Sequence, residues 1–164
     1  WFLNIMQNII LMFFHLSAAA IALGAIVFGA LIIRPVIKKS EEKGSVEESL
    51  EHKLMDRLAP TVLACVFVLI VTGVYYLLVN YTDQVNFKEG YYNIFGMKML
   101  FVVATLGLSV YQTFGQRARI SDLDLRPENK NQVPETLSRM AYTGNMILWT
   151  LIIAIFFGVF LARY

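Results

Sequence analysis

The chain alternates between long apolar runs and shorter polar connections. The apolar runs lie at roughly 8–33, 60–81, 96–116 and 140–162. Each run has about 20 to 26 residues, enough for an α-helix to cross the ~30 Å hydrocarbon core of a bilayer at about 1.5 Å per residue. We therefore predict an all-α fold, a transmembrane four-helix bundle that forms one four-span domain over residues 1–164.

The composition agrees with an integral membrane protein surrounded by lipid. Hydrophobic residues make up 57% of the chain and charged residues only 16%, against about 25% charged residues in soluble domains. A net charge of +2 is too small, and too evenly mixed with acids, for a nucleic-acid-binding protein. The first run lacks a basic leader and a small-residue cleavage site, so we expect a retained helix and not a signal peptide.

Basic residues predict how the bundle is oriented. The first connection contains Arg34, Lys38, Lys39, Lys43, Lys53 and Arg57, and the third contains Arg117, Arg119, Arg126, Lys130 and Arg139. The second connection contains only Lys88. Because basic residues mark the cytoplasmic side, we expect both termini on the outer, periplasmic side of a bacterial inner membrane.

The first connection also contains a helical pattern. Ser45 and Glu48 have the spacing of a capping box, and leucines follow at positions 50, 54 and 58. Leucines at four-residue spacing share one helix face. The pattern predicts an amphipathic helix over roughly 45–58, with Pro60 marking a joint before the second span.

The first span has one face of small residues with a histidine at its start. This face comprises His15, Ala18, Ala22, Ala25 and Gly29. Small residues let membrane helices approach closely, so we expect this face, and the His15 ring, to point into the bundle. Ile26 and Ile32 lie off the face, and we expect them to face lipid.

Polar positions on the other spans predict a partly polar interior. The third span carries Lys98, Thr105, Ser109, Gln112 and Gln116 on one face, and the second carries Thr61, Cys65, Val68, Thr72 and Tyr76. The fourth contributes Asn145 and Trp149, with Gly158 further out. Helices with one polar or small face each associate through those faces.

The depth of His15 predicts its neighbours. About six residues, or ~9 Å, separate it from the outer end of its helix. The same layer should contain Thr72, Tyr76, Ala104, Thr105 and Phe157, with Lys98 near the same outer surface. Ionisable residues inside a membrane are rare and usually functional. The sequence leaves three roles open for His15: a hydrogen bond between helices, ligation of haem or a metal, and proton handling.

These considerations give a candidate cofactor set of His15, Lys98, Thr105 and Tyr76. Met12 lies one turn before His15, and methionine sulfur is a soft ligand for copper(I). A metal site would therefore use His15 and Met12. Methionine is also an ordinary apolar residue of membrane helices, and Cys65 is most simply a small residue of the core.

The first span also resembles a known family. A histidine followed nine residues later by glycine, an Arg-Pro boundary and a basic pair resembles the four-helix core of the copper resistance protein D family. The elements here are His15, Gly24, Arg34-Pro35 and Lys38-Lys39. The layout is also similar to that of the four-helix, haem-binding membrane protoporphyrinogen oxidases. They share a first-span histidine, a segment like EHKLMDRLAP before the second span, and a lysine opening the third, here Lys98.

The resemblance implies a haem-b- or metal-associated redox and electron-transport protein, with His15 as axial ligand supported by Lys98. The copper family implies handling of copper at the periplasmic face. The fourth span departs from the oxidases, because Asn145-Met146-Ile147 stands where they have an Asn-Glu-x-Pro element. That departure leaves it open whether the protein is an enzyme. The alternative is a non-catalytic accessory subunit bound to other subunits of a respiratory or photosynthetic membrane complex.

Overall fold

The computed structural model describes residues 2–33, 48–84, 90–119 and 133–163. The elements are helix α1 (Phe2–Phe28), a π-helical segment η1 (Gly29–Ile33), α3 (Glu48–Gln84), α4 (Tyr91–Val110), a second π-helical segment η2 (Tyr111–Gln116) and α6 (Val133–Arg163). Both π-helical segments directly continue the helices that precede them. The described residues contain no strand.

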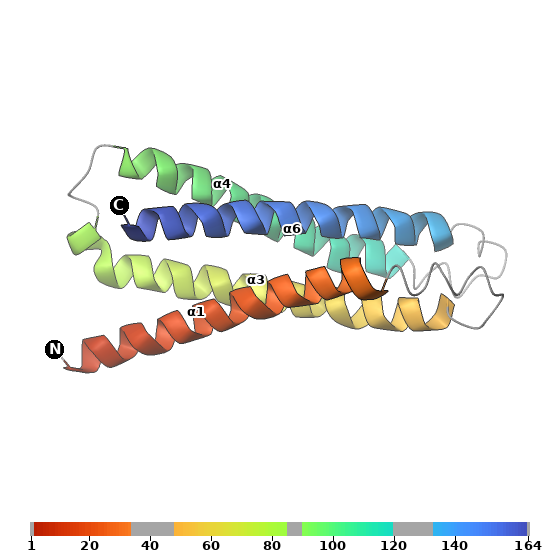
Figure 1. Ribbon diagram of the computed structural model, residues 1–164, viewed down its shortest axis with the longest axis horizontal. Helices are drawn as coiled ribbons and strands as arrows, with labels where there is room; N and C mark the ends of the chain where they lie inside the picture. Colours follow the sequence, from red (N-terminus) through yellow and green to blue (C-terminus); the bar gives the residue numbers. More distant parts are fainter. Residues whose placement is uncertain (1, 34–47, 85–89, 120–132, 164) are drawn as a thin grey trace.

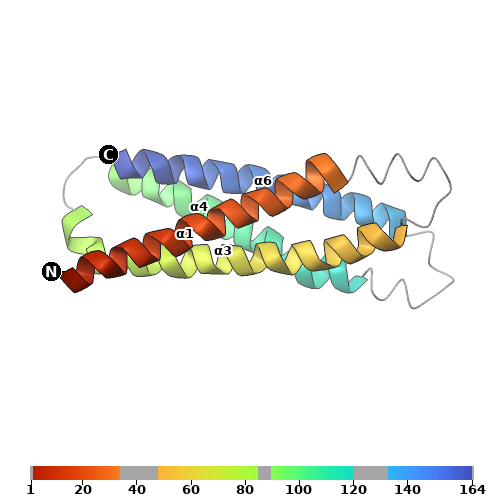
Figure 2. The same cartoon turned by 60° about the horizontal axis from the view of Figure 1, so that its bottom comes forward.

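Four stretches of these helices are long and apolar enough to span a membrane. They are Ile5–Ile32, Arg57–Val79, Tyr91–Arg119 and Ser138–Leu161. The prediction of an all-α, four-span membrane protein is therefore confirmed. The N- and C-termini lie at the same end of the bundle, which we call the terminal end (Figures 1 and 2). The opposite end, where α3 and α6 begin, is the connection end.

The helices pack mainly as two pairs. α1 lies against α3, and α4 lies against α6. Figure 2 shows α1 crossing α3 obliquely, while α4 and α6 run along the far side of the bundle. α3 also contacts α4, which joins the two pairs into one bundle.

The sequence predicts a joint at Pro60, but α3 continues through this residue. Proline removes one backbone donor, and membrane helices tolerate this because nearby Ser and Thr hydroxyls support the weakened turn. Beside the proline, the Thr61 hydroxyl donates to the Arg57 carbonyl at 2.8 Å. The predicted capping residue Ser45 lies outside the described residues.

The small-residue face of α1 is inside the bundle, as its composition suggests. Ala18 and Gly29 are buried and Ala22 is 0% exposed. Ile32 is exposed, as expected, but Ile26 packs against the core cluster of Val62, Val66 and Ile147. The inward surface of α1 is therefore wider than the stripe of small residues.

The expected inward faces of α3 and α6 are partly wrong. On α3, Thr61 and Val68 are exposed, while the core uses Val62 and Val66. On α6, Asn145 and Trp149 are exposed, and the buried residues are Thr136, Met140, Thr143, Gly144, Ile147, Leu151 and Ala154. A threonine can satisfy its hydroxyl on its own helix, as Thr61 does, so its polarity does not fix which face turns inward.

Candidate functional site

His15 turns into the bundle and joins α1 to α3. Its Nδ1 atom lies 2.7 Å from the Oγ1 atom of Thr72. The ring also lies over Gly73, where an added Cβ atom would be 3.4 Å from Cε1 of His15. This is an ordinary van der Waals separation, so the imidazole lies beside Gly73 with room for about a methyl group between them.

The hydrogen bonds of Thr72 bear on which ring nitrogen of His15 carries the proton. The Thr72 hydroxyl lies within bonding distance of the Val68 carbonyl, at 2.6 Å between the oxygens. When it donates there, its oxygen accepts from His15, and Nδ1 then carries the hydrogen. In a neutral imidazole this arrangement leaves a bare lone pair on Nε2.

Lys98 also enters the bundle, from α4. Its Nζ and Cε atoms lie 3.6 and 3.7 Å from the position that a Cβ atom of Gly158 would occupy on α6. Beside it, the rings of Phe101 and Phe157 stack with their centroids 6.0 Å apart. The terminal half of the bundle thus contains an imidazole, an ammonium group and an aromatic pair.

The other two residues of the candidate cofactor set are placed differently. Thr105 is buried, but its hydroxyl donates to the Phe101 carbonyl at 2.7 Å and contacts the Thr150 hydroxyl at 2.9 Å. Thr105 therefore joins α4 to α6, and its hydroxyl is bonded within these two helices and not to His15. Tyr76 is half-buried on α3, one turn beyond Thr72.

Two residues at the site carried no role in the sequence prediction. Gly73 lies against the His15 ring, and the Thr150 hydroxyl contacts the Thr105 hydroxyl. A signal for Thr150 was present, because it shares a helical face with Thr143 and Ile147, which are both buried. Nothing in the sequence pattern singled out Gly73, apart from its position next to Thr72.

Possible sulfur ligands lie away from His15. The Met12 side chain is 53% exposed on the surface of the bundle. Cys65 is half-buried on α3, seven residues before Thr72 and so about 10 Å away along the helix. Within the described ranges, no three His, Cys, Asp or Glu residues are close enough to hold a metal ion together.

Comparison with known proteins gives one family match. The family described as Copper resistance protein D matches residues 52–162. This segment contains nearly all of α3, together with α4, η2 and all but the last residue of α6, and it excludes α1 and His15. No curated protein and no solved structure matches the chain.

Proposed function

The chain belongs to the copper resistance protein D family, and from this premise and the geometry at His15 we propose that it is a membrane redox protein that binds haem b or a metal ion. His15 would be the protein ligand. We place it in a bacterial inner membrane with both termini on the periplasmic side. The family supports a role related to copper resistance, and the redox function is our proposal.

One observation carries the proposal: Nδ1 of His15 lies 2.7 Å from Oγ1 of Thr72, and donation to Thr72 would leave Nε2 unprotonated for a metal. Histidines that bind metals commonly donate their other ring N–H to a neighbouring acceptor, which fixes both the tautomer and the ring orientation. Here Thr72 would be that acceptor.

The available donors fit haem better than a resident copper ion. Haem iron can be held by one axial histidine and would supply one-electron redox chemistry. Lys98 would act as a second ligand or as the partner of a propionate, and the aromatic pair Phe101–Phe157 offers an apolar wall. A dedicated copper(I) site needs several soft ligands, whereas Met12 points to the surface. Copper is therefore better regarded as cargo than as a resident cofactor.

Absorption spectroscopy and metal analysis of the same preparation test this proposal. The protein would be purified in mild detergent without chelators, and its spectrum recorded in oxidised and reduced states. We expect a Soret band and about one iron per chain by mass spectrometry. A colourless preparation without iron would overturn the haem proposal, and copper must be quantified directly because copper(I) is colourless.

A second function has a specific observation in its favour. The His15–Thr72 bond joins α1 to α3, and such a bond also suits a histidine that only holds helices together. In that case the protein would be an accessory subunit of a larger respiratory or photosynthetic membrane complex. Isolation in a mild detergent that preserves complexes separates the two functions: a subunit co-purifies in fixed stoichiometry with larger partners and carries no cofactor of its own.

A further inference from the structure

Buried polar side chains follow one face of α4 and η2 toward the connection end. Thr105, Ser109, Gln112 and Gln116 recur every three or four residues, and each is less than one-tenth exposed. In a bilayer no lipid group can hydrogen-bond to them, so each polar atom needs a partner inside the bundle.

Several of the hydrogen bonds are present. The Gln116 Nε2 atom donates to the Thr143 hydroxyl at 2.9 Å, and the Gln112 Nε2 atom donates to the Met140 carbonyl at 3.3 Å. At the other end of the face, the Thr105 hydroxyl is satisfied by Phe101 and Thr150. The amide nitrogens of Gln112 and Gln116 and the hydroxyl of Thr105 therefore each have a hydrogen-bond partner.

Two buried atoms on the same face have no partner in the described part of the chain. They are Oγ of Ser109 and Oε1 of Gln116. Seven residues separate them, so they are two turns, or about 10 Å, apart. Buried polar groups without a protein partner are commonly bonded to ordered water.

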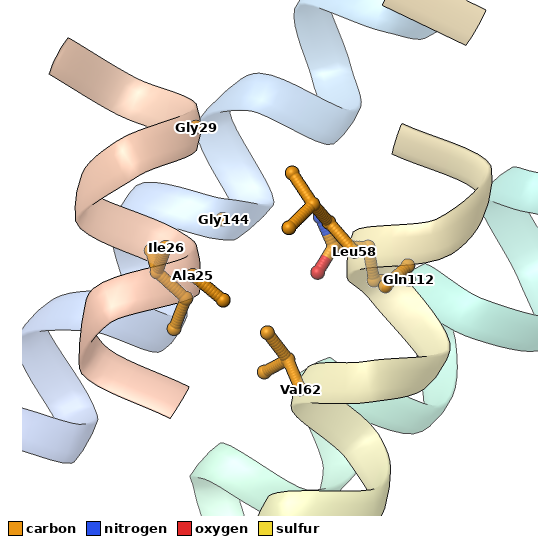
Figure 3. A pocket seen from close by; sticks show the side chains of 8 residues that line it. Ala25, Ile26, Gly29, Leu58, Val62, Gln112 and Gly144 are labelled. Carbon is orange, nitrogen blue, oxygen red and sulfur yellow. The ribbon is translucent and has the colours of Figure 1, made fainter. Parts of the chain in front are cut away.

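Cavities lie beside this face at two levels. One, of about 30 Å³, is lined by Gln112 of η2, Gly29 of η1 and Gly144 of α6, together with the apolar residues Ala25, Ile26, Leu58, Ala59 and Val62 (Figure 3). That volume holds about one water molecule. Near the connection end a larger cavity of about 170 Å³ has polar walls. Its lining residues are Tyr111, Gly115, Gln116, Arg119, Glu135, Thr136 and Arg139.

We propose that water enters the bundle through this larger cavity and continues along Gln116 and Gln112 to Ser109, forming a hydrated half-channel. Both partnerless atoms then have water as their partner. The channel closes at Thr105, whose hydroxyl already has protein partners. The half-channel thus brings water, and with it exchangeable protons, from the connection end to the middle of the membrane. It stands independently of any cofactor at His15.

Infrared spectroscopy of an introduced thiol tests the path. Ser109→Cys replaces oxygen by sulfur in nearly the same volume, and Cys65→Ala removes the native thiol from the spectrum. After transfer to D₂O, we expect the S–H stretch at position 109 to convert to S–D within minutes. Ala22→Cys is the matched control, because Ala22 is fully buried on the small-residue face of α1, and its S–H band should persist for hours.

The route itself needs a second variant. Gln116→Leu places an apolar group between the larger cavity and Gln112, and should slow exchange at position 109 at least tenfold. Exchange as slow as that of the Ala22→Cys thiol would refute the half-channel, and exchange unaffected by Gln116→Leu would refute this route. Should Ser109→Cys not fold, water-edited solid-state NMR of the wild type replaces it. Magnetisation from water must then reach Ser109 before Ala22, and the reverse order would overturn the proposal.

Discussion

The Nδ1 atom of His15 and the Oγ1 atom of Thr72 lie 2.7 Å apart and join the first and second membrane helices. When the Thr72 hydroxyl donates to its own helix at Val68, the histidine donates to it. In that arrangement one threonine positions the ring and leaves Nε2 without a proton. This pair connects the packing of the bundle to its candidate chemistry.

Replacing Thr72 by valine tests this bond. Thr72→Val keeps the shape of the side chain but removes the acceptor of the His15 N–H. We expect a loss of about 1 kcal/mol in the free energy of unfolding, typical of hydrogen bonds between membrane helices. Thr61→Val is the matched control on the same helix, because Thr61 is exposed and bonds only to its own helix. Denaturant titrations in detergent would measure both, and equal effects would contradict the account.

The small-residue face of α1 makes a second prediction. Ala22 is fully buried, so Ala22→Leu should destabilise the bundle by about 1–3 kcal/mol through overpacking. Ala20 is exposed on the same helix, and Ala20→Leu should change the unfolding free energy little. Thermal unfolding followed by circular dichroism compares the two. A bundle that tolerates Ala22→Leu as well as Ala20→Leu would mean that this face is not an interface.

The orientation of the bundle is a third prediction. A reporter active only in the periplasm should be active when fused after Tyr164, and a reporter active only in the cytoplasm should be active when inserted within 120–133. The eleven basic residues of the first and third connections, against one in the second, motivate this expectation. A cytoplasmic C-terminus would place His15 and Lys98 near the inner surface of the membrane and contradict periplasmic copper handling.

Lys98 gives a fourth prediction. If it contacts a haem propionate or acts as a second ligand, Lys98→Met should shift the absorption maxima while the haem stays bound. Gly158→Ala is a useful companion variant, since an added Cβ would lie 3.6 Å from the lysine Nζ atom, an ordinary contact distance. It should therefore leave the spectrum unchanged. Loss of all haem from Lys98→Met would make the lysine a principal ligand and revise the assignment.

The sequence predicts the helices of this fold better than their rotation. Long apolar runs define the four spans, and small residues such as Ala22 define the inward face of α1, because only small side chains allow close backbone approach. The rotation of a helix about its own axis is harder to infer where large apolar residues form the core. Ile26 and Ile147 are chemically identical to lipid-facing isoleucines, and only packing against neighbouring helices distinguishes them.

The candidate site shows the same limit. The position of His15 facing Thr72 follows from depth and periodicity, and the two residues are indeed bonded. Thr105 lies on the expected inward face, yet it pairs with Thr150. A threonine hydroxyl can hydrogen-bond to any neighbouring helix. The partner of Thr105 therefore depends on the relative rotation of α4 and α6. Whether the hydroxyl of Ser109 and the amide oxygen of Gln116 have a protein partner depends in the same way on how the helices are rotated in the assembled bundle.

The most direct test of the central claim is the Soret absorbance of His15→Ala compared with the wild type and Met12→Leu. Alanine suits a face of small residues, so His15→Ala should stay folded, as its circular dichroism would verify. Met12 is exposed on the same helix, and Met12→Leu should keep the wild-type spectrum. We predict that the wild type and Met12→Leu show the band and that folded His15→Ala does not. An equal band in all three proteins, or none in the wild type, would contradict ligation by His15.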